Sequence, residues 1–146
     1  MAETLKLRNE VFLDAAYAIA LAAPNDQHHQ QAVALANQLE ISGIRLITTR
    51  AVVLEIGNAL AKLRYRRAGI ELLNALGNDP QVEILPLSEE LYGQAVQLYQ
   101  ARPDKEWGLT DCISFIVMKE RGLTQALTPD EHFQQAGFQA LLHMRV

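Results

Sequence analysis

The sequence predicts an α/β fold: a three-layer α/β/α sandwich around a mostly parallel central sheet of four to five strands. Two observations lead to this prediction. Short apolar runs alternate with longer segments whose apolar residues recur at helical spacing, and the connections between them are short. Repeated strand–helix–strand units of this kind build parallel sheets covered by helices. With 146 residues and no linker or internal repeat, the chain fits one domain, expected to span 1–146.

The first part of the chain predicts one strand and two helices. Residues 11–13 are an apolar run, which is typical of a buried strand. An alanine-rich helix is expected over 15–23, because Pro24-Asn25-Asp26 interrupts it. Residues 28–41 repeat apolar side chains at helical spacing, and Gly43 ends this second helix.

The middle part predicts two more strands, over 45–48 and 82–85. Between them we expect a long helix that starts at about Ala51 and keeps its apolar spacing as far as Leu63. A further helix is expected over 66–76.

The last part predicts a helix that lies at the centre of the fold. Ser88 is the expected N-cap of a preceding helix, and a polar loop over 101–108 follows that helix. The central helix covers 111–121, is apolar on nearly all sides, and stops at Gly122. The remaining elements are a strand over 123–127, a helical turn opened by residues 128–131 and an edge strand over 138–142.

Composition and charge exclude several classes of protein. The 13 Lys and Arg and 17 Asp and Glu residues give a formal net charge of −4, unlike a protein that wraps duplex DNA. The single cysteine, Cys112, excludes an intrachain disulfide and a cysteine zinc cage and favours a reducing compartment. Residues 1–10 carry both charge signs, unlike a signal peptide, and the apolar stretch 15–23 is too short to cross a bilayer. We therefore expect a cytoplasmic protein with no membrane contact.

Four acidic residues fall where the expected strands end or where the following helices begin. They are Asp14, Glu55, Asp111 and Asp130. Ligands of open parallel sheets bind at the carboxyl ends of the strands, so these acids should share one edge despite their separation in sequence. A divalent cation would relieve their mutual repulsion, and carboxylate oxygens suit Mg²⁺ or Mn²⁺.

Each acid also has a purely structural interpretation. Asp14 could cap the helix that follows it, and Asp111 could serve the dipole of its helix after a Thr110 cap. Asp130 lies in Thr128-Pro129-Asp130-Glu131, which matches a capping box with proline at the first helical position. Glu55 could be a surface or salt-bridged residue, but its apolar neighbours would make an unpaired charge there costly.

Other polar residues near these acids are secondary candidates. Asp104 is either a fifth site acid or a solvated loop charge. Thr48 and Asn58 could position a metal-bound water or a phosphate, with helix capping as the alternative. Trp107 is expected to serve packing, with base stacking as the alternative, and His132 is expected to pack on its helix, with a position facing the site as the alternative. The basic residues that either contact phosphates or form solvated surfaces are Lys62, Arg64, Arg66, Arg67, Arg102 and Lys105.

Four segments, in this order along the chain, carry a family resemblance. They are Val11-Phe-Leu-Asp14, Val53-Leu-Glu55-Ile-Gly-Asn58, Asp104-Lys-Glu-Trp-Gly-Leu-Thr-Asp111-Cys-Ile-Ser-Phe115 and Leu127-Thr-Pro-Asp130-Glu-His-Phe133. Together they span nearly the whole chain, and the third is the most specific. The sequence resembles the PIN-domain ribonucleases, in particular the VapC-type toxins of bacterial toxin–antitoxin pairs.

The resemblance implies a Mg²⁺- or Mn²⁺-dependent endoribonuclease. It implies that Asp14 and Asp111 are the principal metal ligands, that Glu55 and Asp130 are the other catalytic acids, and that Asp104 is a feature of a subgroup. It further implies that in-line hydrolysis of RNA leaves a 5′-phosphate and a 3′-hydroxyl. The implied partners are a cognate antitoxin that covers the site and a second copy of the chain in a homodimer.

Two other classes of function compete with this one. Dehalogenase-like phosphotransferases need a second Asp where Ala16 stands, and response-regulator receivers need an acid where Leu13 stands, so both are disfavoured. A catalytically silent RNA-binding or protein-interaction module on the same fold is the alternative. The presence of all four acids disfavours that alternative.

Overall fold

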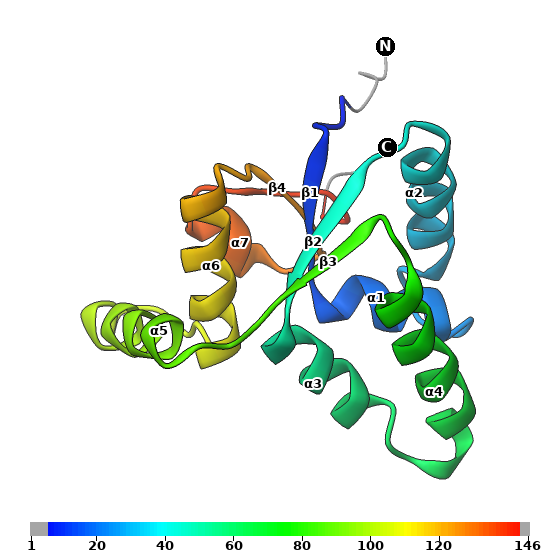
Figure 1. Ribbon diagram of the computed structural model, residues 1–146, viewed down its shortest axis with the longest axis horizontal. Helices are drawn as coiled ribbons and strands as arrows, with labels where there is room; N and C mark the ends of the chain where they lie inside the picture. Colours follow the sequence, from blue (N-terminus) through cyan, green and yellow to red (C-terminus); the bar gives the residue numbers. More distant parts are fainter. Residues whose placement is uncertain (1–5, 144–146) are drawn as a thin grey trace.

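A parallel five-stranded sheet forms the centre of the described chain (Figure 1). The structure, a computed structural model, describes residues 6–143; residues 1–5, part of the segment judged unlike a signal peptide, and residues 144–146 lie outside it. The strands lie in the order β3-β2-β1-β4-β5, with every adjacent pair parallel. They are β1 (Glu10–Leu13), β2 (Arg45–Thr49), β3 (Val82–Leu85), β4 (Gln125–Leu127) and β5 (Gln139–Ala140). The predicted fold class is confirmed, and β5 is the expected edge strand, although it is shorter than the predicted 138–142.

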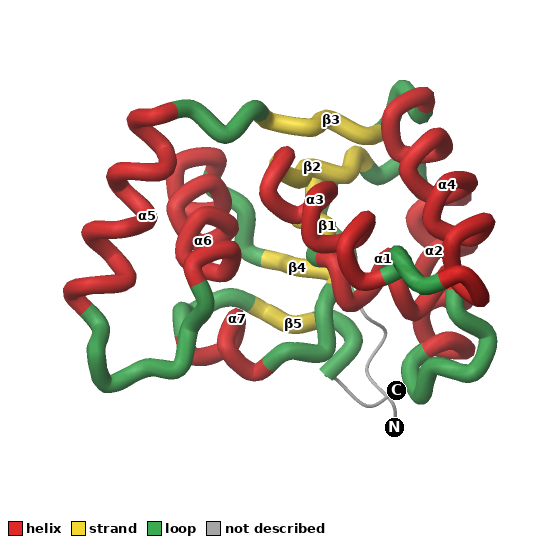
Figure 2. Tube along the Cα trace, turned by 90° about the horizontal axis from the view of Figure 1, so that it is seen from below, coloured by secondary structure: helices red, strands yellow, loops and turns green. Residues whose placement is uncertain are grey.

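Helices cover both sides of the sheet and complete the three layers (Figures 1 and 2). One group is α1 (Ala15–Ala22), α2 (His29–Ile41), α3 (Arg50–Ala59) and α4 (Leu63–Asn78); the other is α5 (Glu89–Ala101), α6 (Leu109–Arg121) and α7 (Glu131–Gln135). Parallel crossovers are right-handed, so connections from β1 through β2 to β3 use one face, and those leading back to β4 and β5 use the other. The strand order therefore reverses between β1 and β4. None of the helices within residues 6–143 is long and apolar enough to span a membrane.

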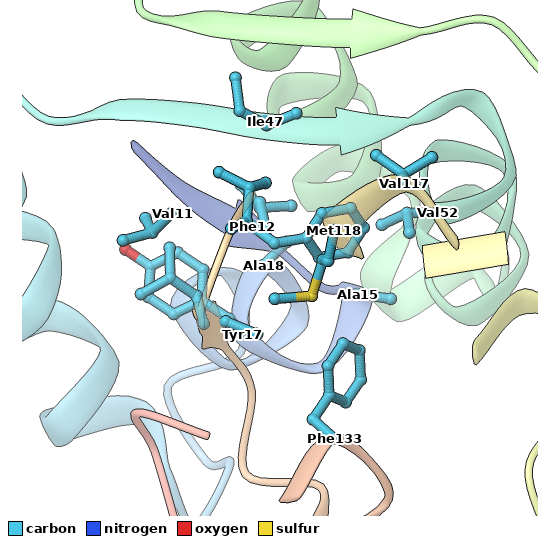
Figure 3. Packing of buried hydrophobic residues seen from close by; sticks show 14 of the residues in the cluster. Val11, Phe12, Ala15, Tyr17, Ala18, Ile47, Val52, Val117, Met118 and Phe133 are labelled. Carbon is cyan, nitrogen blue, oxygen red and sulfur yellow. The ribbon is translucent and has the colours of Figure 1, made fainter. Parts of the chain in front are cut away.

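The hydrophobic core joins the two helix groups through the sheet (Figure 3). Phe12 of β1, Met118 of α6 and Phe133 of α7 are fully buried. The ring of Phe115 on α6 packs edge-on against Trp107 and Phe133, with ring centroids 5.0 Å apart in each case. The expected packing role of Trp107 and the central position of α6 are thus confirmed. This aromatic cluster fixes the loop before α6 and the helix α7 relative to each other.

The path between β2 and β3 differs from the prediction. The helix expected to continue to Leu63 ends at Ala59, and α4 begins at Leu63 rather than at residue 66. Leu63 is 93% exposed, so it extends the apolar pattern without belonging to the core. The break lets α4 turn back onto α3, where a Cβ added at Gly69 would lie 3.0 Å from Leu60 Cβ and 3.3 Å from its carbonyl oxygen. The strand β4 is likewise shorter than the expected 123–127.

Two glycine substitutions in α4 test this close approach. A Cβ added at Gly77 has no neighbour within 4 Å, so Gly77→Ala should stabilise the protein. We expect a gain of about 0.5–1 kcal/mol, because alanine favours helix and restricts the unfolded chain. Gly69→Ala should instead cost roughly 1–2 kcal/mol, because the buried Leu60 has to move. Urea unfolding followed by circular dichroism measures both changes, and an equal gain in the two variants would contradict the tight α3–α4 contact.

Candidate active site

The candidate site is built around the point where the strand order reverses, at the carboxyl ends of β1 and β4. Asp14 follows β1 directly, and Thr128 follows β4. Both side chains are buried, and Thr128 Oγ1 donates a hydrogen bond to Asp14 Oδ2 over 2.8 Å. The same hydroxyl oxygen accepts the backbone N–H of Asp130 at 3.1 Å. Thr128 therefore ties the first and fourth acids together across the switch point.

Asp14 is held in an environment that resists its negative charge. Burial raises the pKa of Asp14 to about 7, and the hydrogen bonds from Thr128 and the Ala15 backbone offset only part of that effect. The nearby carboxylates of Glu55 and Asp111 raise the pKa further. Asp14 occupies the N-cap position of α1, but its side chain makes no capping hydrogen bond. Helix capping alone therefore does not account for this carboxylate.

Asp111 approaches the site from the first turn of α6. The helix begins at Leu109 with Gly108 as its N-cap, so the expected Thr110 cap is wrong. Asp111 Oδ2 accepts the backbone N–H of Gly108 at 3.0 Å and lies 3.1 Å from Nδ1 of His132. Burial raises the pKa of Asp111, the bonds from Gly108 and His132 lower it, and the Asp130 carboxylate raises it again, with a net upward shift. The carboxylate thus serves its helix and also faces the other acids.

Glu55 reaches the site from α3, but not for the reason that the sequence suggested. Its side chain is exposed, so the expectation that apolar neighbours surround its charge is wrong. Partial desolvation raises the pKa of Glu55, as do the carboxylates of Asp111 and Asp130, whereas a hydrogen bond with the Thr110 side chain lowers it. Glu55 therefore lies at the open side of the acidic group, against the start of α6.

Asp130 is the N-cap of α7, and its Oδ1 accepts the backbone N–H of His132 at 2.9 Å. The expected capping box with Pro129 inside the helix is wrong, because α7 begins at Glu131. Of the two interpretations of His132, the structure favours the one that faces the site, because its Nδ1 lies 3.5 Å from Asp130 Oδ1. The sequence does contain a signal for this position of His132. It is the second residue of α7, and the N-cap and the second residue of a helix lie close together.

The four predicted acids come together in the structure. Each of them either raises the pKa of another of the four acids or has its own pKa raised by one, and Asp111 is linked in this way to all three others. Asp111, Asp130 and His132 each offer a ligand atom within 4.8 Å of the other two. The arrangement is a concentration of negative charge at the switch point, with one imidazole at its side. Such a group of side chains can bind a cation and can accept or donate protons.

The secondary candidates are placed differently. Asp104 is exposed and accepts two hydrogen bonds from the Arg102 guanidinium, at 3.0 and 2.9 Å, and this bond lowers the pKa of Asp104 to about 2. Thr48 is fully buried and donates its hydroxyl proton to the Leu13 carbonyl at 2.7 Å, which ties β2 to β1. Asn58 is exposed near the end of α3. These hydrogen bonds of Asp104 and Thr48 go to Arg102 and to the Leu13 carbonyl, and not to any of the four acids.

The basic candidates form two groups. Arg102 and Lys105 lie in the loop before α6, and the Arg102 guanidinium is 5.2 Å from the centre of the Trp107 ring. The other group is exposed around the start of α4 and consists of Lys62, Arg64, Arg66 and Arg67.

A separate cavity of about 540 Å³ lies among α1, α2, α4 and the adjoining strands. Its lining is mainly apolar and includes Tyr17, Leu39 and Leu76. None of the four acids lines it, so this cavity is distinct from the acidic site.

The raised pKa of Asp14 predicts how the stability of the metal-free protein depends on pH. The pKa of about 7 in the folded protein exceeds the ordinary value of 3.8, so the folded state binds this proton more tightly. The resulting stabilisation is complete below about pH 4 and is lost as the pH rises through 7. The free energy of unfolding should therefore fall between pH 5 and pH 8 in the wild-type protein, and in Asp14→Asn this fall should be smaller by on the order of a few kcal/mol. Urea unfolding in EDTA at both pH values tests this, and identical pH dependence in the two proteins would contradict the raised pKa.

Comparisons with known proteins relate this arrangement to a family. The sequence matches the PIN domain family over residues 11–139. VapC20 of Mycobacterium tuberculosis, a Sarcin-Ricin loop cleaving toxin, aligns with 88% of this chain and 95% of its own, with 25% sequence identity and a TM-score of 0.77. A search of curated proteins gave no match.

Two further solved structures share the fold. VapBC2 of Rickettsia felis, solved with a DNA fragment from their promoter, aligns over 90% of this chain and 96% of its own, at 12% identity and a TM-score of 0.65. FitAcB of Neisseria gonorrhoeae aligns over 92% of this chain and 99% of its own, at 19% identity and a TM-score of 0.65. The family match covers all four acids and both strands of the switch point. The chain therefore belongs to the PIN-domain family.

Proposed function

We propose that this PIN-domain protein is a metal-dependent endoribonuclease and the toxin of a type II toxin–antitoxin pair. The observation that carries the proposal is the gathering of Asp14, Glu55, Asp111 and Asp130 at the switch point of the sheet. The similarity to VapC20, a Sarcin-Ricin loop cleaving toxin, supports RNA as the substrate class.

The donor set fits a divalent cation. Asp14, Glu55 and Asp111 all have raised pKa values, with desolvation the largest cause for each and neighbouring carboxylates a further one, and a bound cation would offset both effects. Carboxylate oxygens are the ligands that Mg²⁺ and Mn²⁺ prefer. We assign Asp14 and Asp111 as the principal ligands, supported by Glu55 and Asp130. A bound ion supplies polarisation of the scissile phosphate and a lowered pKa of bound water.

The chain's own residues orient the carboxylates and take up the proton. Thr128 fixes one oxygen of Asp14, and the Gly108 N–H fixes one oxygen of Asp111. Glu55 is the exposed acid of the group, and partial desolvation raises its pKa. We therefore assign Glu55 as the acceptor of the proton from the attacking water, because a base is more effective when its pKa approaches the working pH.

RNA binding would rely on local positive charge, since the net charge of the chain is −4. Lys62, Arg64, Arg66 and Arg67 are exposed at the start of α4, just beyond the helix that carries Glu55. Lys105 and Arg102 lie in the loop that leads to Asp111, although Arg102 already pairs with Asp104. We propose that these side chains contact the phosphates on either side of the scissile bond.

A matched pair of Asp→Asn variants tests the nuclease proposal. We expect purified protein to cleave RNA in Mg²⁺ or Mn²⁺ and to stop in EDTA. Asp111→Asn should lower the cleavage rate by at least about 100-fold, because a charged ligand is lost while the amide oxygen can still accept the Gly108 N–H. Asp26→Asn is the control, because Asp26 lies in the α1–α2 loop and its acceptor role toward the His28 N–H is also preserved.

Three outcomes would count against the proposal. Cleavage that continues in EDTA would contradict the metal dependence. Full activity in Asp111→Asn with an unchanged melting temperature would mean that this acid serves only its helix. RNA binding without cleavage in either metal would instead favour the catalytically silent module.

We further propose two protein partners and a cytoplasmic location. A cognate antitoxin would cover the acidic site, and a second copy of the chain would form a homodimer. Leu54 supports the homodimer, because it is 59% exposed on α3 and adjoins Glu55 in sequence. The free thiol of Cys112 supports a reducing compartment.

Expression in bacteria tests the toxin role separately from the chemistry. Induction of the chain without its neighbouring antitoxin gene should arrest growth, and co-expression of that gene should restore it. Asp111→Asn, expressed at the same level, should leave growth unaffected. Harmless expression of a protein that is active in vitro would contradict the toxin role and leave the nuclease proposal standing.

A further inference from the structure

A histidine lies beside the acids at the start of α6 and α7. His132 Nδ1 is 3.1 Å from Asp111 Oδ2 and 3.5 Å from Asp130 Oδ1. All three side chains are partly buried. Within residues 6–143, no other group of three His, Cys, Asp or Glu side chains meets the spacing expected for a shared ion. The imidazole is therefore part of the most compact donor group in the described chain.

The spacing of these donor atoms suits a single ion. Two donors bound at right angles, each about 2.1 Å from one ion, are about 3 Å apart. The distances from His132 Nδ1 to the two carboxylates are close to that value. Asp130 Oδ1 already accepts the backbone N–H of His132, but a carboxylate has several lone pairs and can accept a further partner. That backbone bond also holds the two side chains side by side.

We propose that His132 is a nitrogen ligand of the metal site and that it makes the site prefer Mn²⁺ over Mg²⁺. This inference rests on the proposed metal dependence of the nuclease. Nδ1 of His132 lies 3.1 Å from Asp111 Oδ2, and the imidazole tautomer protonated at Nε2 would present its Nδ1 lone pair to an ion shared with that carboxylate. Mg²⁺ favours oxygen ligands and keeps its waters, whereas imidazole binds transition-metal ions more readily. An imidazole added to the carboxylates of this site therefore favours Mn²⁺.

The competing role for His132 is to orient Asp111 through a hydrogen bond and never to touch the metal. His132→Asn separates the two roles. The asparagine amide can donate an N–H from nearly the same place as Nδ1, but an amide nitrogen does not bind a metal ion. His28→Asn is the matched control, because His28 lies in the α1–α2 loop.

Pulsed electron paramagnetic resonance of Mn²⁺ bound to the full chain tests the proposal directly. The wild-type protein and His28→Asn should show coupling between Mn²⁺ and a directly bound ¹⁴N nucleus, and His132→Asn should lack it. Calorimetric titration with Mn²⁺ and with Mg²⁺ should show that the ratio of their affinities falls by roughly tenfold in His132→Asn. Absence of ¹⁴N coupling in the wild-type spectrum would by itself overturn the ligation, so the proposal can be contradicted however well the variant folds.

Each other outcome identifies what fails. Mn²⁺ bound without ¹⁴N coupling in the wild-type protein would overturn the ligand role of His132 and leave the nuclease proposal intact. An unchanged Mn²⁺-to-Mg²⁺ affinity ratio in His132→Asn would overturn the metal preference. Failure of the wild-type protein to bind either ion would overturn the proposed metal dependence itself.

Discussion

The hydrogen bond between Thr128 and Asp14 is the interaction on which the candidate site depends. It crosses the switch point from β4 to β1, and both side chains are buried there. A neutral hydroxyl compensates a buried carboxylate only in part, so the pKa of Asp14 rises to about 7. The fold thus keeps a costly group at the place where adjacent crossovers leave room for a ligand. Such a cost is typical of sites where function limits stability.

Helix capping and site formation use the same atoms in this molecule. Asp111 accepts the Gly108 N–H at the start of α6, and Asp130 accepts the His132 N–H at the start of α7. Each bond restricts the rotation of its carboxylate, and each carboxylate keeps lone pairs for another partner. The aromatic contacts of Phe115 with Trp107 and Phe133 then hold the two helix starts together. The structural and functional interpretations of these acids are therefore compatible.

The sequence was sufficient to predict the parallel sheet and the shared position of the acids. Apolar periodicity distinguishes strands from helices, and parallel topology places the residues after each strand at one edge. Periodicity could not predict that Leu63 begins a new helix, because an exposed leucine continues the same pattern. It also could not predict the exposure of Glu55, which depends on how α3 packs after its Thr49 cap. The contact of His132 with Asp111 could not be predicted either, because the two residues lie on different helices, 21 residues apart.

Diffraction from crystals grown with Mn²⁺, recorded near the manganese absorption edge, tests the central claim most directly. If the four acids form a cation site, the anomalous map should contain a peak bounded by Asp14 and Asp111, with Asp130 beside it. The account would be contradicted if, at a saturating Mn²⁺ concentration, the anomalous map had no peak among the four acids. It would also be contradicted if peaks appeared only at surface carboxylates such as Asp104.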